Sequence, residues 1–258
     1  MPNGSYNNTL DDVLSSFGAE ITWMAKNKTN PDGWDYVSLY CSTSKMNSST
    51  FDDAVLECYL KKIKIGIAWS APSQIDDVIA YNARQTDERK KITFMTTELE
   101  TYGSTPNCTV ANYRTWIKDN YSKMKAAGLK SYVYEGWNYN YDVTVPYSDG
   151  FLLHAYRTTA QMNTKDDMYK YMAGSNNDKR MAMIAAEGKK VGKIVEVSVL
   201  TSCEPSFGLD YYKVHEWNDA YDAVKESFSR LASADMKQWL ILDGAFVFTS
   251  RFMQQAKP

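Results

Sequence analysis

The stretch from Lys61 to Glu100, KKIKIGIAWSAPSQIDDVIAYNARQTDERKKITFMTTELE, contains the pattern that predicts the fold. It starts with a short apolar run at 63–69 that is rich in isoleucine. A segment with 3.6-residue periodicity follows at 73–88, and a second apolar run follows at 91–100. A strand, a helix and a strand in this order are typical of a parallel βαβ unit.

The same alternation extends over the whole chain. Strand-like runs lie at 3–8, 35–41, 63–69, 91–100, 131–137, 150–157, 193–201 and 240–249. Helical periodicity covers 10–28, 51–62, 73–88, 109–127, 165–190 and 215–236, whereas the link at 138–149 has no helical pattern. Eight strands in about 250 residues is the usual size of a (β/α)8 TIM barrel. We therefore predict an α/β protein with a single barrel domain over 1–258.

Residues at the ends of the predicted helices agree with this division. Ser49-Thr50 and Ser73 are N-capping residue types directly before acidic first turns, and Gly128 is a typical stop signal after 109–127. A doubly wound open sheet is the alternative fold. That alternative lacks its glycine-rich phosphate turn, because neither GxGxxG nor GxxxxGK[ST] occurs in the chain.

The composition excludes several classes of protein. Apolar residues make up 44% and charged residues 23%, so the chain has enough apolar area to fold and global disorder is excluded. The 29 Lys and Arg against 31 Asp and Glu give a net charge of −2, which argues against nucleic-acid binding through phosphate neutralisation. No apolar run approaches the roughly 18 residues that span a bilayer. Residues 1–5 show neither a basic region nor an apolar run, so no signal peptide is predicted.

The residue types that bind metals or carry redox chemistry are sparse. The four cysteines are far apart and form no CxxC pair: Cys41, Cys58, Cys108 and Cys203. A disulfide framework is neither required nor excluded by this spacing. With only two histidines, His154 and His215, a His-rich metal site is not expected. We predict no metal and no cofactor.

Two carboxylates stand at the end of the fourth predicted strand, where barrel enzymes carry their working residues. Because side chains alternate along a strand, Glu98 and Glu100 share one face. Phe94 and Thr96 lie earlier on the same face. Neighbouring carboxylates raise each other's proton affinity, so one of them can stay protonated near neutral pH as a general acid. The alternative is a pair of solvated carboxylates on the rim.

Later strand ends add further candidate residues. His154 and Tyr156 are expected to point into the barrel, with Tyr156 nearer its mouth. Glu135 ends the fifth predicted strand, and Glu204 follows the seventh at mouth level. Glu196 lies low in the seventh strand and is expected to pair in the core, with Lys64 of the third strand or another interior polar group.

Aromatic residues are unusually frequent, with seven Trp and 19 Tyr. Many follow the predicted strand ends: Trp69, Tyr102, Trp137, Tyr139, Tyr141, Tyr156, Phe207, Tyr211 and Tyr212. Sugar rings stack on aromatic faces and carboxylates bind sugar hydroxyls, so acids and aromatics at one barrel end favour a carbohydrate cleft. Ordinary anchoring of loops by Trp and Tyr explains a part of this set.

The run at 92–100 resembles the strand-4 motif DxxDxDxE of family-18 glycoside hydrolases, the chitinases and endo-β-N-acetylglucosaminidases. The aligned positions are Thr93, Thr96, Glu98 and Glu100. The resemblance implies that Glu100 is the general acid/base. It also implies that Glu98 holds an N-acetyl group whose carbonyl acts as the nucleophile, and that Tyr156 supports the same intermediate.

The motif departs from the family pattern. Thr93 and Thr96 replace aspartates that tune the acid, and Glu98 is one methylene longer than aspartate. A displacement of about 1 Å costs on the order of 10²-fold in rate, which weakens the substrate-assisted mechanism. On the eighth strand, Phe246 and Phe248 stand where the family has a tryptophan.

More broadly, the chain looks like a set of barrel proteins from Bacteroidetes bacteria. The similar pieces are 37–40, 99–102, 153–157 and 201–207. Glycan-active barrels usually work outside the cytoplasm, so the resemblance implies an extracellular or periplasmic location.

The leading hypothesis is a glycoside hydrolase-like barrel that acts on a glycan, with N-acetylglucosamine as the sugar that the resemblance implies. Glu100 is the proton donor, Glu98 the stabiliser or orienter, and Tyr156 the hydrogen-bond donor to the intermediate. The expected substrate contacts are Trp137, Glu135, Trp69, Tyr102, His154 and Glu204. One alternative is a non-catalytic barrel that binds a glycan or a protein. The other, a metal-dependent phosphodiester hydrolase, is disfavoured by the single interior histidine.

Overall fold

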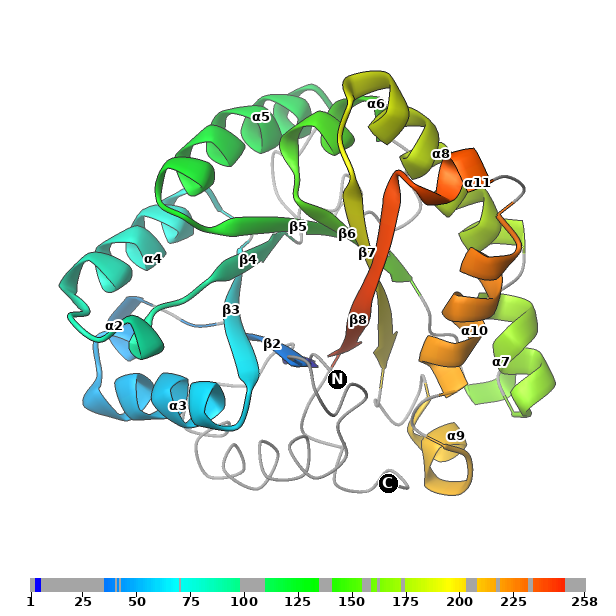
Figure 1. Cartoon of the computed structure of the whole chain (residues 1–258). Helices are drawn as coiled ribbons and strands as arrows, with labels where there is room; N and C mark the ends of the chain where they lie inside the picture. Colours follow the sequence, from blue (N-terminus) through cyan, green and yellow to red (C-terminus); the bar gives the residue numbers. More distant parts are fainter. Residues whose placement is uncertain are drawn as a thin grey trace.

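In the computed structural model, parallel strands form a curled sheet with helices along its outer side (Figure 1). The structure describes residues 3–5, 35–39, 41, 43–69, 71–97, 110–134, 141–154, 159–161, 163–172, 175–202, 208–216, 219–231 and 234–248. The first predicted helix, 10–28, lies outside these ranges.

Within the described residues, eight strands pair in chain order. They are β1 (Asn3–Ser5), β2 (Asp35–Leu39), β3 (Ile63–Trp69), β4 (Phe94–Thr97), β5 (Lys130–Tyr134), β6 (Gly150–His154), β7 (Val195–Ser202) and β8 (Leu240–Phe248). Every neighbouring pair is parallel, and β1 also pairs with β8, so the hydrogen-bonded sheet closes on itself. The predicted α/β class with a curled parallel sheet is therefore confirmed. The complete eightfold repeat of strand and helix stays a prediction.

Helices connect the strands along the outside of the sheet (Figure 1). The α-helices are α2 (Thr43–Met46), α3 (Ser49–Leu60), α4 (Ser73–Arg84), α5 (Val110–Ala126), α6 (Tyr141–Thr144), α7 (Lys165–Met172), α8 (Ser175–Val191), α9 (Leu209–Val214), α10 (Asp219–Ser229) and α11 (Ala234–Lys237). Short 3₁₀ turns are η1 (Glu88–Lys90), η2 (Val145–Tyr147) and η3 (Thr159–Gln161). As predicted, the described part of the link between β5 and β6, 141–149, holds only short pieces, α6 and η2.

Two of the predicted helices are divided in the structure. The segment expected at 165–190 forms α7 and α8, and Gly174, a poor residue for a helix interior, stands in the sequence between them. The segment expected at 215–236 forms α10 and α11, while α9 precedes it. Periodicity shows which side of a segment is apolar. Two successive short helices with the same apolar side give the same pattern as one long helix.

The helix ends follow local chemistry, with small shifts from the expected residues. Ser48, one residue earlier than predicted, caps α3 by accepting a hydrogen bond from the Phe51 backbone N–H at 3.2 Å. Ser73 is the first residue of α4 rather than its cap. Gly128 ends α5 as predicted: its φ of +73° suits glycine, and the Leu129 N–H bonds back to the Met124 carbonyl.

The strands bury two different faces. On the outer side, Ile65, Ile67 and Val197 belong to one apolar cluster that includes residues of the surrounding helices. Full burial of each such side chain contributes roughly 1.5–3 kcal/mol. The inward side chains Leu152 and Leu200 belong to a second cluster inside the barrel. The outward and inward alternation predicted for β6 and β7 is thus confirmed at these positions.

Inside the barrel, three rings form what we call the aromatic layer: Tyr36, Phe94 and Tyr132. Their centroids lie 5.6–6.2 Å apart in edge-to-face arrangements. Two glycines make room for them, because a Cβ on Gly66 would lie 2.3 Å from the Phe94 ring and one on Gly150 would lie 2.8 Å from the Tyr132 ring. The barrel interior is therefore filled by side chains at this level.

Candidate functional site

On β5, Tyr134 is the next residue on the inward side above Tyr132, and it packs against the interior cluster. Four other described inward positions toward the C-terminal ends of the strands carry small side chains. These are Ser38, Ala68, Thr96 and Ser198, and all four are buried. The Ser38 and Thr96 hydroxyls hydrogen-bond each other at 2.6 Å between oxygens. Catalytic residues of barrels lie at this end of the strands. These small residues therefore lie directly below the expected mouth.

Strand β4 leads from this base toward the predicted acids. Phe94 and Thr96 point inward and Met95 points to the helices, which is the alternation that the sequence predicted for this strand. Glu98 and Glu100 continue the strand sequence but lie outside the described residues. Their place in the mouth therefore stays a prediction.

Strand β6 shows the predicted alternation as well. Phe151 and Leu153 belong to the helix-facing cluster, and Leu152 belongs to the interior cluster. His154 is the last residue of β6 and its backbone pairs with Leu200 of β7. Five other predicted site residues lie outside the described part of the chain: Tyr102, Glu135, Trp137, Tyr156 and Glu204.

Trp69 does not stand on the rim where a sugar could stack. It is fully buried in the helix-facing cluster with Ile65 and Ile67 of the same strand, and its indole N–H has no hydrogen-bond partner within the described residues. The physical reason is the alternation along β3: Lys64, Gly66 and Ala68 take the inward side. An odd-numbered position at the end of this strand therefore packs against helices.

Other aromatics expected near the rim anchor the helix layer instead. Tyr141, Tyr211 and Tyr212 are buried in the same helix-facing cluster as Trp69. Each follows a strand closely in sequence, but each lies in or beside a helix whose apolar side faces the sheet. The position of an aromatic residue after a strand end therefore does not show whether it can stack on a sugar or packs a helix against the sheet.

At the opposite, N-terminal end of the barrel lies a group that we call the basal cluster. It comprises Tyr36, Lys64, Lys130, Tyr132, Glu196 and Asp243. Glu196 accepts hydrogen bonds from Lys130 Nζ at 2.6 Å and from the Tyr132 hydroxyl. The Tyr132 hydroxyl also lies 3.4 Å from Asp243 Oδ2. Glu196 thus pairs inside the barrel as predicted, but these hydrogen bonds join it to Lys130 and Tyr132 rather than to the expected Lys64.

Burial and neighbouring charges alter ionisation in the basal cluster. Burial raises the pKa of the Asp243 carboxyl above its usual value, against the effect of a hydrogen bond from Tyr36. Burial, assisted by the neighbouring carboxylates, also raises the pKa of the Tyr132 phenol. The pKa of Lys64 is lowered by burial and by the neighbouring charge of Lys130. The side chains of the basal cluster contact one another, and residues at the N-terminal end of a barrel serve the fold rather than its chemistry.

Sequence reasoning missed most of the basal cluster. Tyr36, Lys130 and Asp243 occupy inward positions near the N-terminal ends of their strands, so the signal was present in the alternation. The alternation marks each position as inward, but it does not show that these side chains meet.

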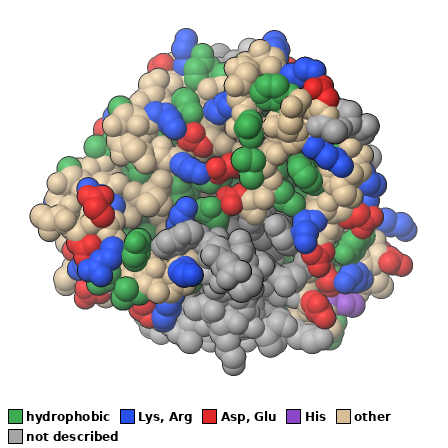
Figure 2. Space-filling model, in the orientation of Figure 1, with side chains coloured by type: hydrophobic (Ala, Val, Ile, Leu, Met, Phe, Trp, Pro, Cys, Tyr) green, Lys and Arg blue, Asp and Glu red, His purple; other side chains and the backbone are tan. Residues whose placement is uncertain are grey.

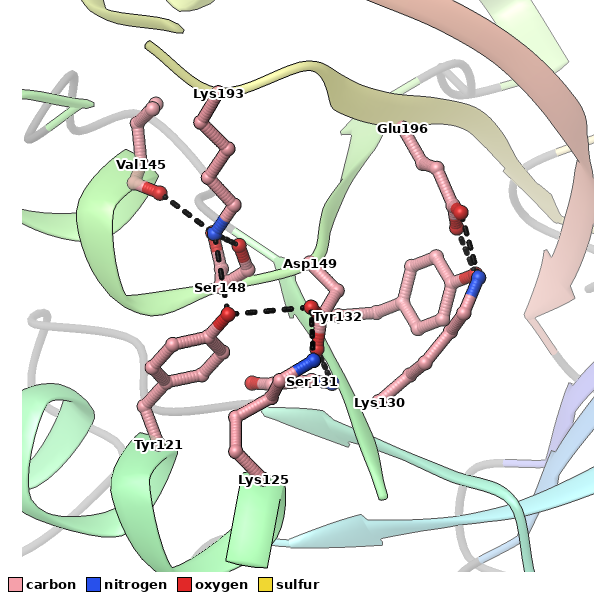
Figure 3. A network of polar contacts seen from close by, with 10 residues as sticks. All are labelled: Tyr121, Lys125, Lys130, Ser131, Tyr132, Val145, Ser148, Asp149, Lys193 and Glu196. Carbon is pink, nitrogen blue, oxygen red and sulfur yellow. Dashed lines mark hydrogen bonds and ion pairs between the residues drawn. The ribbon is translucent and has the colours of Figure 1, made fainter. Parts of the chain in front are cut away.

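A second polar network secures the region where β5 and β6 begin (Figure 3). Asp149 accepts hydrogen bonds from the Tyr121 hydroxyl and from Lys125 Nζ, both at 3.2 Å, and from the Ser131 backbone N–H at 2.8 Å. Lys193, just before β7, donates to the Val145 carbonyl at 3.2 Å and to Tyr121 at 3.3 Å. These contacts thereby join α5 and η2 to the starts of β5, β6 and β7.

The visible face of the molecule mixes both signs of charge (Figure 2). Lys and Arg side chains lie among Asp and Glu side chains over the helices and around the centre of this face. Within the described ranges, no helix is long and apolar enough to cross a membrane. No group of three or more His, Cys, Asp or Glu side chains in that same part could hold a metal ion.

Comparison with solved structures identifies a similar barrel. The chain is similar to the catalytic domain of the GH26 endo-β-1,4-mannanase from Bacillus sp. JAMB-750, with a TM-score of 0.52 and 10% sequence identity. The match covers 100% of this chain and 78% of the mannanase chain. The similarity concerns the fold. It supports a barrel fold like that of this catalytic domain and does not single out family 18.

Comparisons of the sequence itself find no relative. No protein-family model matches the chain, and no curated protein matches it.

Proposed function

We propose that this protein is a single-domain (β/α)8 barrel over residues 1–258 that hydrolyses glycosidic bonds. The fold similarity to a glycoside hydrolase catalytic domain supports this proposal. The observation that carries it is the inward side of β4, marked by Phe94 and Thr96, because strand alternation continues this side to Glu98 and Glu100. The ends of barrel strands are where catalytic side chains are found.

In the proposed mechanism, Glu100 protonates the leaving-group oxygen and Glu98 orients the substrate. Tyr156 donates a hydrogen bond to the intermediate. Two carboxylates that cleave a glycoside flank the sugar, about 5–5.5 Å apart for retention and about 6.5–9.5 Å apart for inversion. Because Glu98 and Glu100 share one strand, we propose that the second catalytic carboxylate comes from another strand, as Glu135 after β5 or Glu204 after β7.

The proposed substrate contacts are Trp137, Tyr102 and His154, in addition to the carboxylates. Trp69 is not among them, because its side chain is buried against the helices. The strand-4 resemblance to family 18 favours a glycan with N-acetyl groups. The similar structure is an endo-β-1,4-mannanase, so a plain β-1,4-linked mannan is the other substrate class to test.

Turnover of a glycan panel tests the proposal. The panel contains chitin oligosaccharides, N-glycans, β-1,4-mannan and other plain β-glucans, and reducing ends released over time are measured. We expect turnover of at least one glycan and loss of this turnover in Glu100→Gln, which keeps the side-chain shape but cannot donate the proton. No turnover on any glycan, or full turnover in Glu100→Gln, contradicts the proposed mechanism.

A second candidate function is glycan binding without hydrolysis. Thr96 stands where the family-18 motif has an acid, and its hydroxyl is buried and bonded to Ser38 instead of carrying a charge. Tight binding of a panel member without turnover, measured by calorimetry, would favour this function over hydrolysis.

A further inference from the structure

Large apolar side chains are exposed at the N-terminal ends of three strands. Leu60, in the turn before β3, is 64% exposed, and Ile194, directly before β7, is 53% exposed. Ile241, the second residue of β8, is 51% exposed. Because neighbouring strands of the barrel are parallel, these strand starts lie at the same end. Single exposed apolar residues scattered over a surface are ordinary, whereas a group of them at one end marks an interaction surface.

Ile241 shows that this end of the barrel has an opening that solvent reaches. Leu240 and Leu242 pack with the helix-facing cluster, so the side chain between them takes the inward side. An inward side chain that is half exposed lies at an opening. Ile241 pairs in register with Glu196 of the basal cluster, which also includes Lys64 from β3. The turns before β3, β7 and β8 therefore border the same opening.

Lysine dominates the charge at this end. For β3 to β8, we consider the four residues before each strand and the first three residues within it. These described positions hold eight lysines and two carboxylates: Lys61, Lys62, Lys64, Lys90, Lys91, Lys130, Lys193 and Lys237, against Asp149 and Glu196. The whole chain has a net charge of −2, so its basic residues are unevenly distributed.

The stability of the fold explains a part of this lysine excess. Several helices end just before these strands, and a cation near a helix C-terminus is favourable. Lys61 pairs with Glu57 and Lys91 with Glu88, in contacts that are partly exposed and therefore weak. None of this explains why Leu60, Ile194 and Ile241 are exposed among the lysines.

Two lysines at this end keep their charge available to a partner. Lys62 is exposed in the turn next to Leu60. Lys237 donates a hydrogen bond to the Ser229 carbonyl at 2.6 Å, and a neutral acceptor leaves the lysine charge in place. A partner that fits this end therefore offers negative charge and an apolar environment together.

The pattern favours an anionic lipid surface over other partners. A second copy of the chain would bring lysine-rich ends together, and like charges repel. A protein interface has a contiguous apolar core, whereas the apolar side chains here lie on separate turns with lysines between them. A lipid surface presents anionic headgroups to the lysines and accepts each apolar side chain separately.

We propose that the N-terminal end of the barrel docks reversibly on an anionic phospholipid surface. Leu60, Ile194 and Ile241 enter the boundary between headgroups and acyl chains, while Lys62 and its neighbouring lysines contact the headgroups. The attachment is peripheral and requires both contributions. In this orientation the C-terminal ends of the strands point away from the lipid. The inference is independent of the proposed hydrolysis of glycans.

Flotation of the full chain with lipid vesicles tests the proposal. One set of vesicles contains phosphatidylcholine alone, and the other contains phosphatidylcholine mixed with phosphatidylglycerol. We expect binding to the mixed vesicles at low salt and little binding to the neutral ones. High salt should weaken the binding, because it screens exposed charges.

Two variants separate the apolar from the electrostatic contribution. Leu60→Ser should lower the partition onto mixed vesicles by roughly 5- to 10-fold, because an apolar side chain no longer enters the lipid. Lys62→Glu should lower it by a similar factor through charge reversal. The matched controls lie on α9, where Val214 is 66% exposed and Lys213 is exposed as well. Val214→Ser and Lys213→Glu should bind like the wild type, and Tm measurements should show that all four variants fold.

Three results would overturn lipid docking. The first is no binding to the mixed vesicles, or an equal loss in Leu60→Ser and Val214→Ser. The second is equal binding to an acidic polysaccharide with no effect of Leu60→Ser, which would indicate a general polyanion site. The third is a dimer in analytical ultracentrifugation that Leu60→Ser dissociates, which would assign this end to a second copy of the chain.

Discussion

The two ends of the barrel use charged residues differently. At the N-terminal end, the carboxylate of Glu196 is held by Lys130 and Tyr132 inside the basal cluster. At the C-terminal end, Ser38 and Thr96 carry small inward side chains whose hydroxyls bond each other, and Tyr134 packs against the interior cluster. The comparison teaches that charge committed to partners within the fold supports stability, whereas chemistry requires charge that a substrate can still reach.

The largest expected effects come from replacing one carboxylate at each end of the barrel and comparing turnover with stability. Glu100→Gln should lower turnover by about 10²- to 10⁴-fold, because the proton donor is lost, and should leave the free energy of unfolding unchanged. Glu196→Gln should lower that free energy by about 1 kcal/mol, since a partly exposed pair with Lys130 is weakened, and should leave kcat unchanged. Kinetics and urea denaturation of both variants check this. The opposite pattern in either variant would break the comparison.

Gly66→Ala should give the largest loss of stability in the barrel interior. The added Cβ would lie 2.3 Å from the Phe94 ring, and overpacking of this kind costs about 1–3 kcal/mol. Combining it with Phe94→Leu, which removes the ring that clashes, should restore part of the loss. Urea denaturation of the two single variants and the double variant measures the coupling. If the two stability losses simply add in the double variant, the aromatic layer is packed more loosely than the contacts indicate.

Asp243→Asn should change the pH dependence of stability. Burial raises the pKa of Asp243, so the native state binds this proton more tightly than the unfolded chain does. The contribution is complete below the ordinary Asp pKa of about 3.9 and is lost as pH rises through the raised native pKa. The groups that face Asp243 are Tyr36, Lys64, Lys130, Tyr132 and Glu196.

The expected result for Asp243→Asn is a Tm that is higher than the wild type at pH 7 by a few degrees, on the order of 2–4 °C. The advantage should disappear near pH 3. Asp235→Asn, which alters an exposed pair with Lys189, serves as the control. A lower Tm for Asp243→Asn at pH 7 would mean that the hydrogen bonds to the ionised carboxylate outweigh its burial.

The smallest expected effect is a gain at the turn between α3 and β3. Lys62 has a φ of +57°, a left-handed conformation that costs a residue with a Cβ roughly 1–2 kcal/mol. Lys62→Gly should therefore raise stability by about 0.5–1 kcal/mol after the entropy of the more flexible unfolded chain is included. Gly128→Ala, at a φ of +73°, should lower stability by a similar amount. Thermal unfolding of both variants measures the two changes in stability.

Much of the fold could be read from residue patterns. The apolar run at 63–69 matches β3, and Gly128 ends α5, because β-branched runs and a left-handed glycine have local physical causes. The sides of β4, β6 and β7 were also predictable, since alternation along a strand needs no knowledge of distant residues. The same reasoning directs Glu98 and Glu100 toward the mouth in the proposed function.

Only the tertiary structure decided which polar and aromatic residues are committed to the fold. Trp69 ends β3 and Tyr211 follows β7, positions that suit stacking residues, yet both are buried in the cluster that packs the helices against the sheet. Lys130 and Glu196 are 66 residues apart in sequence. They meet because the closed sheet brings the first residues of β5 and β7 to the same end of the barrel. Sequence determines which face a side chain takes through local backbone geometry, whereas burial and pairing depend on which distant elements that face meets.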